Sequence, residues 1–389
     1  MTKAVCFVAA ALLFSGAARA EQPSPAVTDF SHGVGTHAMP TPPESSTAAP
    51  AGVTPPAAAP AASAPPPAPK QSAEALACAN SDGKAAPQQR DDACSLLIDS
   101  HKWQGKEIAW AYANRCAVRV RLKQVDRALA DCSEAIDQDP DQTMAYQLRA
   151  EIHRTRDERA KALEDFDKAI ALGAKNAALF AGRGFVRLID GDAAKALEDF
   201  DREVAIAGGA AEPWMDRGSA ELGVGDDAKA EQDFAKAAEL DPNNAQVWLN
   251  RGVAALGAGD SVRANAFFVE ALKRDPNQTY AALWRFIARD GSPEAKAELQ
   301  AYADKAGKDW PFAVTQFYLG RAEAGEIFGA AKSDDQQCEA RYYVAHFQIM
   351  TGAAQDAAVG IKRAVDSCPK NFIEYFRAVA DQKKLDAAK

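Results

Sequence analysis

The sequence has little histidine and lacks the short motifs that hold a metal ion, a phosphate or a catalytic serine. Five histidines occur in 389 residues, and the chain has no H-E-x-x-H, C-x-x-C, P-loop or G-x-S-x-G pattern. His32 and His37 lie in a stretch rich in proline and alanine, where we expect them to be solvated. His101, His153 and His346 lie far apart, and we expect packing or surface roles for them rather than metal ligation. The sequence therefore predicts no catalytic residue, no metal site, no cofactor and no enzymatic activity.

The chain also has no excess of positive charge, no long apolar run and no sustained alternation of apolar and polar residues. Its formal net charge of −9 argues against a phosphate-binding surface spread over the whole protein. The apolar run from Val5 to Phe14 is too short to span a bilayer. Alternation with a period of two, which is typical of a half-buried strand, is not sustained anywhere. We therefore expect no nucleic-acid partner, no integral membrane span and no β-sheet.

The first 20 residues are typical of a secretory signal peptide. Lys3 precedes the apolar run, and Ala18-Arg19-Ala20 gives the small-x-small pattern of a cleavage site. Cys6 lies within the apolar run, which is too early for it to become the first residue of a lipoprotein. We therefore expect cleavage after Ala20 and export to the periplasm.

Residues 21–70 are dominated by proline and alanine. This range holds 13 of the chain's 21 prolines, and such a composition buries too little apolar surface to offset the entropy of ordering. We expect a disordered linker with local polyproline-II conformation. It would serve either as a spacer through the cell wall or as a tolerated low-complexity segment.

From residue 71 onward helix-forming residues dominate, and a repeat of 34 residues organises the chain. Five repeats start at residues 109, 143, 177, 211 and 245, and alanine stands at position 20 of each. Position 4 is aromatic, position 8 is small or cysteine, and position 24 is phenylalanine or cysteine. Small side chains at position 8 let two helices approach closely, and the rings at positions 4 and 24 fill the space around them. Positions 8 and 24 hold Cys116, Ala150, Gly184, Gly218 and Gly252, and Cys132, Phe166, Phe200, Phe234 and Phe268.

These recurring residues resemble the tetratricopeptide repeat, in which two antiparallel helices form each unit. The resemblance implies an all-α fold, a right-handed superhelical solenoid of antiparallel helix hairpins with a concave inner face. We expect five such units at 109–278, preceded by a degenerate first hairpin at 71–108.

A regular pattern of charges follows the same repeat. Position 7 is arginine in all five units, and position 23 is aspartate in the first four. This favours a ladder of partly buried ion pairs, in which each arginine meets the aspartate of its own unit or of the preceding one. The alternative is a row of arginines that grips an anionic ligand. The residues are Arg115, Arg149, Arg183, Arg217 and Arg251, with Asp131, Asp165, Asp199 and Asp233.

Six cysteines follow the expected signal peptide, and an even number in an exported chain favours disulfides. Two pairs share a spacing of sixteen residues and take positions 8 and 24 of their hairpins. The third pair takes positions 1 and 31 of a later hairpin, and these two ends lie side by side when the helices are antiparallel. The predicted disulfides are Cys78–Cys94, Cys116–Cys132 and Cys338–Cys368.

The regular pattern breaks after residue 278, and a clean unit returns at residue 338. The segments "YAALWRF", "WPFAVTQFYLG", "CEARYYVAHFQIMTG" and "CPKNFIEYFRA" resemble the C-terminal half of NlpI-type proteins, which are tetratricopeptide proteins of the bacterial envelope. We expect an irregular NlpI-like helical segment at 279–337 and a C-terminal hairpin and tail at 338–389. The resemblance implies a non-catalytic adaptor that recruits peptidoglycan hydrolases and a protease, and it implies that homodimers can form. The chain departs from the family because it lacks a lipoprotein cysteine and adds the linker and the cysteine pairs.

The concave inner face is built from positions 2, 5, 9 and 12 of the first helix of each unit. Positions 5, 9 and 12 are polar in the second unit and mostly apolar from the third to the fifth, so one interpretation is an apolar groove for an extended peptide or a helix. The other is that these side chains pack under a neighbouring helix or form a dimer contact. The candidate partner-binding residues are Gln147, Glu151, Phe185, Leu188, Met215, Leu222 and Leu249.

The sequence therefore predicts a non-enzymatic periplasmic scaffold that binds other envelope proteins or peptides, such as cell-wall hydrolases or a protease. The alternative is a structural subunit of an envelope assembly for polysaccharide or secretion.

Overall fold

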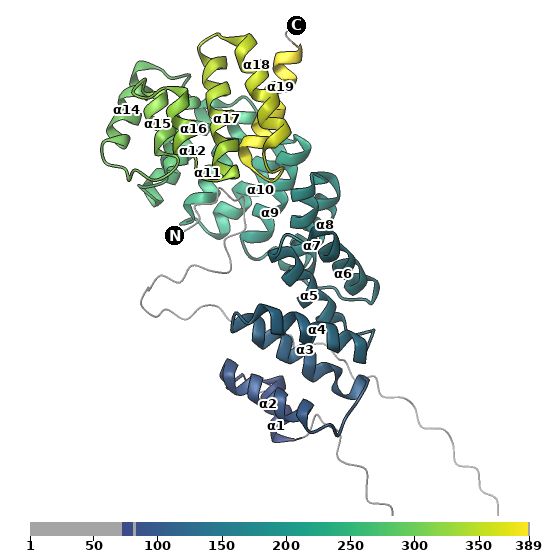
Figure 1. The fold of residues 1–389 in the computed structure, drawn as a ribbon. Coiled ribbons are helices and arrows are strands. Elements are labelled where there is room, and N and C mark those ends of the chain that lie inside the picture. Colours follow the sequence, from purple (N-terminus) through teal and green to yellow (C-terminus); the bar gives the residue numbers. More distant parts are fainter. Residues whose placement is uncertain (1–71, 81–82, 388–389) are drawn as a thin grey trace, which may run out of the picture. The chain divides into compact units, whose positions relative to one another are not determined.

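A computed structural model of the chain describes residues 72–80 and 83–387 (Figure 1). These residues form 19 α-helices and no strand, so the prediction of an all-α fold of helix hairpins is confirmed. The expected signal peptide and linker, with His32 and His37, lie outside the described residues. The described chain divides into two compact units, an N-terminal unit at 72–152 and a C-terminal unit at 153–387. The boundary falls within α5 (Thr143–Thr155).

The N-terminal unit consists of two hairpins, each with a disulfide across it. The structure joins Cys78 to Cys94 with a Cα–Cα distance of 4.8 Å, and Cys116 to Cys132 with a distance of 5.4 Å. All four cysteines are fully buried, so each disulfide sits in the small core of its hairpin. The helices are α1 (Ala73–Ala79), α2 (Pro87–Asp99), α3 (Lys106–Arg121) and α4 (Val125–Gln138).

The C-terminal unit begins with regular hairpins whose turns are fixed by positions 15 and 16 of the repeat. A glycine with a φ of 85° to 86° stands at position 15, and its left-handed conformation ends the first helix. The aspartate that follows accepts a hydrogen bond from the backbone N–H three residues later and so caps the second helix. These turns are Gly191-Asp192, Gly225-Asp226 and Gly259-Asp260. The helices are α6 (Arg159–Ala171), α7 (Ala177–Asp190), α8 (Ala193–Ala207), α9 (Glu212–Val224), α10 (Asp227–Leu240), α11 (Ala245–Gly257) and α12 (Ser261–Arg274).

The core of each regular hairpin is a phenylalanine ring that lies against a glycine. A Cβ atom at Gly184 would stand 2.7 Å from the ring of Phe200, and one at Gly218 would stand 2.8 Å from the ring of Phe234. Phe200, Phe234 and Phe268 are fully buried. The ring therefore occupies the space that a side chain at position 8 would need. The disulfide Cys116–Cys132 takes the same two positions, so it replaces this glycine–phenylalanine contact by a covalent bond.

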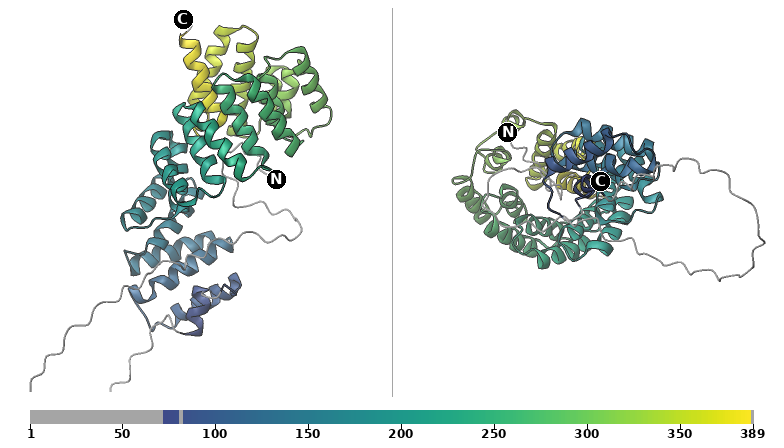
Figure 2. Two further views of the ribbon diagram at one scale, coloured as in Figure 1. Left: turned by 180° about the vertical axis from the view of Figure 1, so that it is seen from behind. Right: turned by 90° about the horizontal axis from the view of Figure 1, so that it is seen from below.

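The remainder of the C-terminal unit starts with four short helices of 7 to 11 residues and ends with three longer ones. Helices α17 and α18 form a hairpin closed by Cys338 and Cys368, whose Cα atoms lie 5.0 Å apart. Figure 2 shows this last part, in yellow, beside the teal helices of the same unit. The helices are α13 (Thr279–Ile287), α14 (Pro293–Ala303), α15 (Phe312–Tyr318), α16 (Ala324–Ala330), α17 (Asp334–Met350), α18 (Ala354–Ser367) and α19 (Ile373–Ala387).

Candidate functional site

Two of the arginines at position 7, Arg183 and Arg217, form ion pairs both within and between repeats. In the third unit, Arg183 donates to Asp199 of its own hairpin at 2.6 Å and to Asp167 of the preceding helix α6 at 2.5 Å. In the fourth unit, Arg217 donates in the same way to Asp233 at 2.7 Å and to Asp201 at 3.0 Å. Of the two partners considered from the sequence, the aspartate at position 23 of the same repeat is therefore used, whereas the contact with the preceding repeat goes to an aspartate at position 25. Because carboxylates already surround these guanidinium groups, they do not form a row that grips an anionic ligand.

The arginine of the fifth repeat, Arg251, has other partners because this repeat lacks the aspartate at position 23. In the fifth unit Phe267 replaces the aspartate, and Arg251 lies over its ring, 4.1 Å from the ring centre. The Nε atom of Arg251 donates to Glu231 of the preceding hairpin at 2.8 Å. One unit later Arg285 forms an ion pair with Glu298 at 2.8 Å. Arg183, Arg217 and Arg251 therefore each tie their own repeat to the preceding one.

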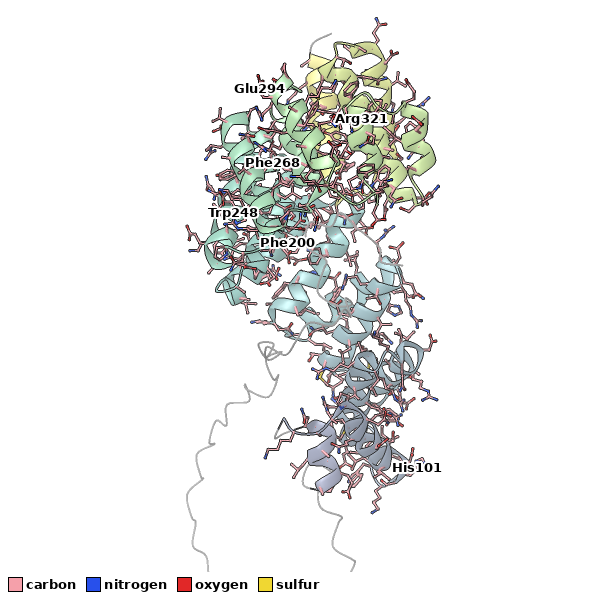
Figure 3. All side chains as sticks on the ribbon, turned by 90° about the vertical axis from the view of Figure 1, so that its left-hand side faces the viewer. His101, Phe200, Trp248, Phe268, Glu294 and Arg321 are labelled. Carbon is pink, nitrogen blue, oxygen red and sulfur yellow. A yellow bond between two sulfur atoms is a disulfide. The ribbon has the colours of Figure 1, made fainter. Side chains whose placement is uncertain are left out.

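The histidines of the described residues take structural positions. His153 is buried, and its Nδ1 atom lies 2.8 Å from Glu158 at the end of the same turn. His346 stacks on the ring of Tyr342, and its Nδ1 atom lies 3.0 Å from Asp381 of α19. His101 is exposed in the loop after α2 (Figure 3). The side chains of residues 72–80 and 83–387 hold no group of three or more histidine, cysteine or acidic residues arranged around a metal position.

The structure separates the candidate partner-binding residues into two groups. Gln147, Glu151 and Phe185 are half-buried. The other four are buried, with exposed fractions of 1% to 5%, so the expected open apolar groove is closed in this structure. Two of them pack against neighbouring helices of the repeat array, and the other two share a cluster with Phe376 of α19. The buried residues are Met215 and Leu249 in the first pair, and Leu188 and Leu222 in the second.

Helix α19 closes this part of the inner face. Phe376 lies among Leu188, Leu222 and Ala193 and is 4% exposed. The next residue, Arg377, forms an ion pair with Asp227 at the start of α10. We did not expect this contact from the sequence, because 150 residues separate its two partners.

One signal in the sequence does mark the place where α19 docks. Position 13 of the repeat changes from Arg121, Thr155 and Ile189 to Gly223 and Gly257. A Cβ atom at Gly223 would stand 3.4 Å from Phe376 and 2.7 Å from the Cβ atom of Ala193, and one at Gly257 would overlap Arg377 and Asp227. Neither glycine has a positive φ, so close approach explains them and turn geometry does not.

A buried pair of acids lies where the third hairpin meets the fourth. Position 27 is alanine in the other units but Glu203 here, and Glu203 and Asp216 of α9 are 5% and 4% exposed. One carboxylate oxygen of each finds no hydrogen-bond partner among the described residues. Burial raises the pKa of Glu203 to about 8, and the nearby Glu212 adds to the shift. Burial, and then Glu203, raises the pKa of Asp216 well above its usual range.

The substitution Glu203→Ala is expected to stabilise the C-terminal unit, and more so at high pH. The unfolded chain releases the Glu203 proton near pH 4.5, whereas the folded chain keeps it until about pH 8. The free energy of unfolding of the wild type should therefore fall as the pH rises between these values, by about 1 kcal/mol per pH unit. The alanine variant lacks this loss because it lacks the carboxyl group. Urea denaturation at pH 5 and pH 8 measures this, with Glu198→Ala on the exposed side of α8 as the matched control. A loss of stability in Glu203→Ala at pH 8 would contradict this account of the acid pair.

A second pair of buried acids lies in the aromatic core of the C-terminal unit. Glu339 accepts hydrogen bonds from the hydroxyl of Tyr280 at 2.7 Å and from the indole N–H of Trp310 at 2.8 Å. Glu374 of α19 accepts one from the hydroxyl of Tyr343 at 2.9 Å. Burial raises the pKa of Glu339 to about 8 and that of Glu374 to about 7. Both carboxyl groups are enclosed by the core, so their role is to fix the packing of α13, α17 and α19.

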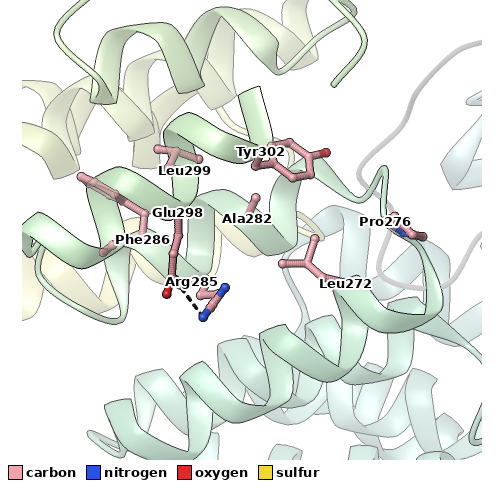
Figure 4. A pocket seen from close by; sticks show the side chains of 9 residues that line it. Leu272, Pro276, Ala282, Arg285, Phe286, Glu298, Leu299 and Tyr302 are labelled. Carbon is pink, nitrogen blue, oxygen red and sulfur yellow. Dashed lines mark ion pairs between the residues drawn. The ribbon is translucent and has the colours of Figure 1, made fainter. Parts of the chain in front are cut away.

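A small cavity lies between α12, α13 and α14 (Figure 4). Its volume is about 230 Å³, which suits one side chain rather than a whole small-molecule ligand. The ion pair of Arg285 and Glu298 lies on one side, so the cavity offers no uncompensated charge at that point. Its other lining residues are Leu272, Pro276, Ala282, Phe286, Ala295, Leu299 and Tyr302.

The comparison with protein families identifies one unit of the array. Residues 211–244 match the family of the tetratricopeptide repeat. These residues form a tetratricopeptide repeat. They coincide with the fourth unit of the 34-residue period, which starts at residue 211. The tetratricopeptide fold is typical of protein-interaction scaffolds.

Within residues 72–80 and 83–387, no helix is both long enough and apolar enough to cross a membrane.

Solved structures similar to this chain are also tetratricopeptide proteins or pilus factors. YrrB, "a TPR protein with an unusual peptide-binding site", is 24% identical over 49% of this chain and 96% of its own, with a TM-score of 0.46. The pilF protein of Pseudomonas aeruginosa is 18% identical over 51% of this chain and 89% of its own, with a TM-score of 0.44. PilW, a type IV pilus biogenesis factor, is 20% identical over 50% of this chain and 93% of its own, also with a TM-score of 0.44. At these scores the likeness carries no functional argument. No curated protein matches the chain.

Proposed function

We propose that the protein is a non-enzymatic scaffold of the periplasm that binds other envelope proteins through its tetratricopeptide array. The observation that carries this proposal is the tetratricopeptide repeat at 211–244, with hairpins of the same register before and after it. Such arrays present an extended surface built from the first helix of each unit, and they use it to bind peptides or helices. In the second repeat, Gln147 and Glu151 stand at positions of that surface and are only half-buried.

The periplasmic location is supported by the cysteines. All six cysteines of the described residues are joined in pairs within single hairpins. Disulfides of this kind persist in oxidising compartments and are rare in the cytosol. The signal-like pattern of the first 20 residues agrees with export.

The proposed partners are cell-wall hydrolases or a protease. This choice rests on the resemblance of residues 279–380 to NlpI-type adaptors. The same resemblance leads us to propose that the protein can form a homodimer. The chain itself would supply binding and positioning, while its partners carry the chemistry.

A pull-down from an envelope extract tests this function. The mature chain, with an affinity tag in the linker, is expected to recover hydrolases or a protease, and the purified chain alone is expected to leave muropeptides intact. Glu151→Lys on the inner face should reduce the recovery, whereas Lys168→Glu on the exposed side of α6 should not. Recovery of a single stable multisubunit complex would favour a structural subunit instead. Muropeptide cleavage by the purified chain would contradict both functions.

A further inference from the structure

Helix α19 packs mainly on α18 and α17, and it also lies on the repeat array. Lys370, just before α19, donates to the backbone carbonyl of Asp190 at 3.2 Å. Phe376 enters the apolar cluster of α7 and α9, and the Nη1 atom of Arg377 lies 3.3 Å from the Oδ2 atom of Asp227. These contacts combine an aromatic anchor in an apolar recess with a charge pair beside it, which is the usual composition of a helix-in-groove interface.

The array leaves room for this helix at Gly257 of α11. A Cβ atom there would overlap the side chains of Arg377 and Asp227. Gly223, at the same position of the preceding repeat, is required by the close approach of Ala193, and Phe376 lies in ordinary contact with it.

The covalent structure allows α19 to leave without unravelling the hairpin before it. The disulfide Cys338–Cys368 joins the start of α17 to the residue after α18, and Pro369 follows immediately. The hairpin of α17 and α18 is therefore closed independently of everything after residue 368.

The contact of Arg377 with the array is incomplete. The Nε atom of Arg377 is buried and has no hydrogen-bond partner within the part of the chain that the structure describes. This atom keeps its full cost of desolvation, so α19 is not an optimal occupant of the site.

We propose that α7, α9 and α11 form a helix-binding groove, and that α19 occupies this groove in the free protein. The partner is a helix of another protein that carries an aromatic residue followed by arginine and displaces α19. The apolar recess among Leu188, Leu222 and Gly223 receives the aromatic ring, and Asp227 receives the arginine. This inference rests on the proposed scaffold function and names the class of partner for it.

The probe is a fluorescent synthetic peptide of residues 369–387, added to the full chain. In the release variant Phe376→Ala/Arg377→Ala, α19 loses both anchors, and the peptide is expected to bind at least about tenfold more tightly than it binds the wild type. Adding Asp227→Ala to that variant should weaken binding about tenfold, because the arginine of the peptide loses its carboxylate. A peptide with alanine at both anchor positions should bind neither protein.

Fluorescence anisotropy gives the affinities, and circular dichroism and disulfide mapping show whether the release variant is folded. A folded release variant that does not bind the peptide, or that binds it equally with and without Asp227, overturns the proposal. A release variant that exchanges α19 between two copies, seen as a dimer that excludes the peptide, also overturns it, because the groove then belongs to a second copy of the chain.

A second variant keeps the test decisive if the release variant does not fold. Asp227→Ala alone should accelerate tryptic cleavage after Lys370 and Arg377 about tenfold, whereas Glu239→Ala, an exposed acid on the same helix α10, should leave the rate unchanged. Equal cleavage in the two variants contradicts the proposal. If the peptide binds but the pull-down recovers no envelope protein, the scaffold function is refuted and the groove serves only to hold α19. If the pull-down recovers an envelope protein but the peptide does not bind, the groove proposal alone is refuted.

Discussion

Replacing Asp199 by alanine is expected to destabilise the C-terminal unit by about 3–5 kcal/mol. Its side chain is fully buried and accepts hydrogen bonds from Arg183 at 2.6 and 3.0 Å and from Arg187 at 2.8 Å. Removing the carboxylate leaves two buried or half-buried guanidinium groups without their shared counter-charge. Urea denaturation, followed by the fluorescence of Trp214 and Trp248, measures the loss.

The matched control lies two residues away on the same helix. Asp201 also pairs with an arginine of the ladder, Arg217, but its side chain is 58% exposed. Asp201→Ala should cost less than about 1 kcal/mol, as exposed ion pairs do. Equal losses in the two variants would show that burial does not determine the strength of this ladder.

Replacing Cys116 and Cys132 of the second hairpin is expected to cause the next largest loss of stability, in this case of the N-terminal unit. The bond between Cys116 and Cys132 closes a loop with a separation of sixteen residues, which corresponds to about 3 kcal/mol in the chain-entropy model. Cys116→Ala/Cys132→Ala also leaves a cavity at the position where the later units hold a buried phenylalanine. The stability of the N-terminal unit should therefore fall by about 3–5 kcal/mol. Urea denaturation followed by Trp103 and Trp110, which pack in that unit, reports it.

The equivalence of this disulfide and the aromatic contact can be tested separately. Cys116→Ala/Cys132→Phe reproduces the pair Ala150 and Phe166 of the next unit, both of which are fully buried. This variant should be more stable than the double alanine by about 2 kcal/mol, because the ring fills the cavity while the covalent constraint stays lost. If the phenylalanine variant is the less stable of the two, the two contacts are not interchangeable.

The hairpins and their cores could be predicted because they depend on contacts within about 34 residues. The period places Gly184 opposite Phe200, and Arg183 opposite Asp199, without any knowledge of the rest of the chain. The sequence left open whether each arginine meets the aspartate at position 23 of its own repeat or of the preceding one. The structure shows the pair within the repeat, and the contact with the preceding repeat goes to position 25, as in the pair of Arg183 with Asp167.

The inner face could not be predicted in the same way. Periodicity identifies Leu188 and Leu222 as inner-face residues, but it does not say what covers them. Their cover is Phe376, which lies more than 150 residues away in the sequence. The buried pair of Glu203 and Asp216 also escaped notice, although a glutamate at a position that otherwise holds alanine was its signal. Departures from the repeat thus mark the places where parts distant in sequence meet or where charge is buried.

Site-specific photo-crosslinking in cells tests most directly the central claim that the inner face of the array binds another protein. A photoreactive residue is placed at Glu151 on the inner face or at Lys168 on the exposed side of α6. The account predicts a crosslink to another envelope protein from position 151 and none from position 168. A crosslink from position 168 alone, or equal crosslinks from both positions, would contradict it.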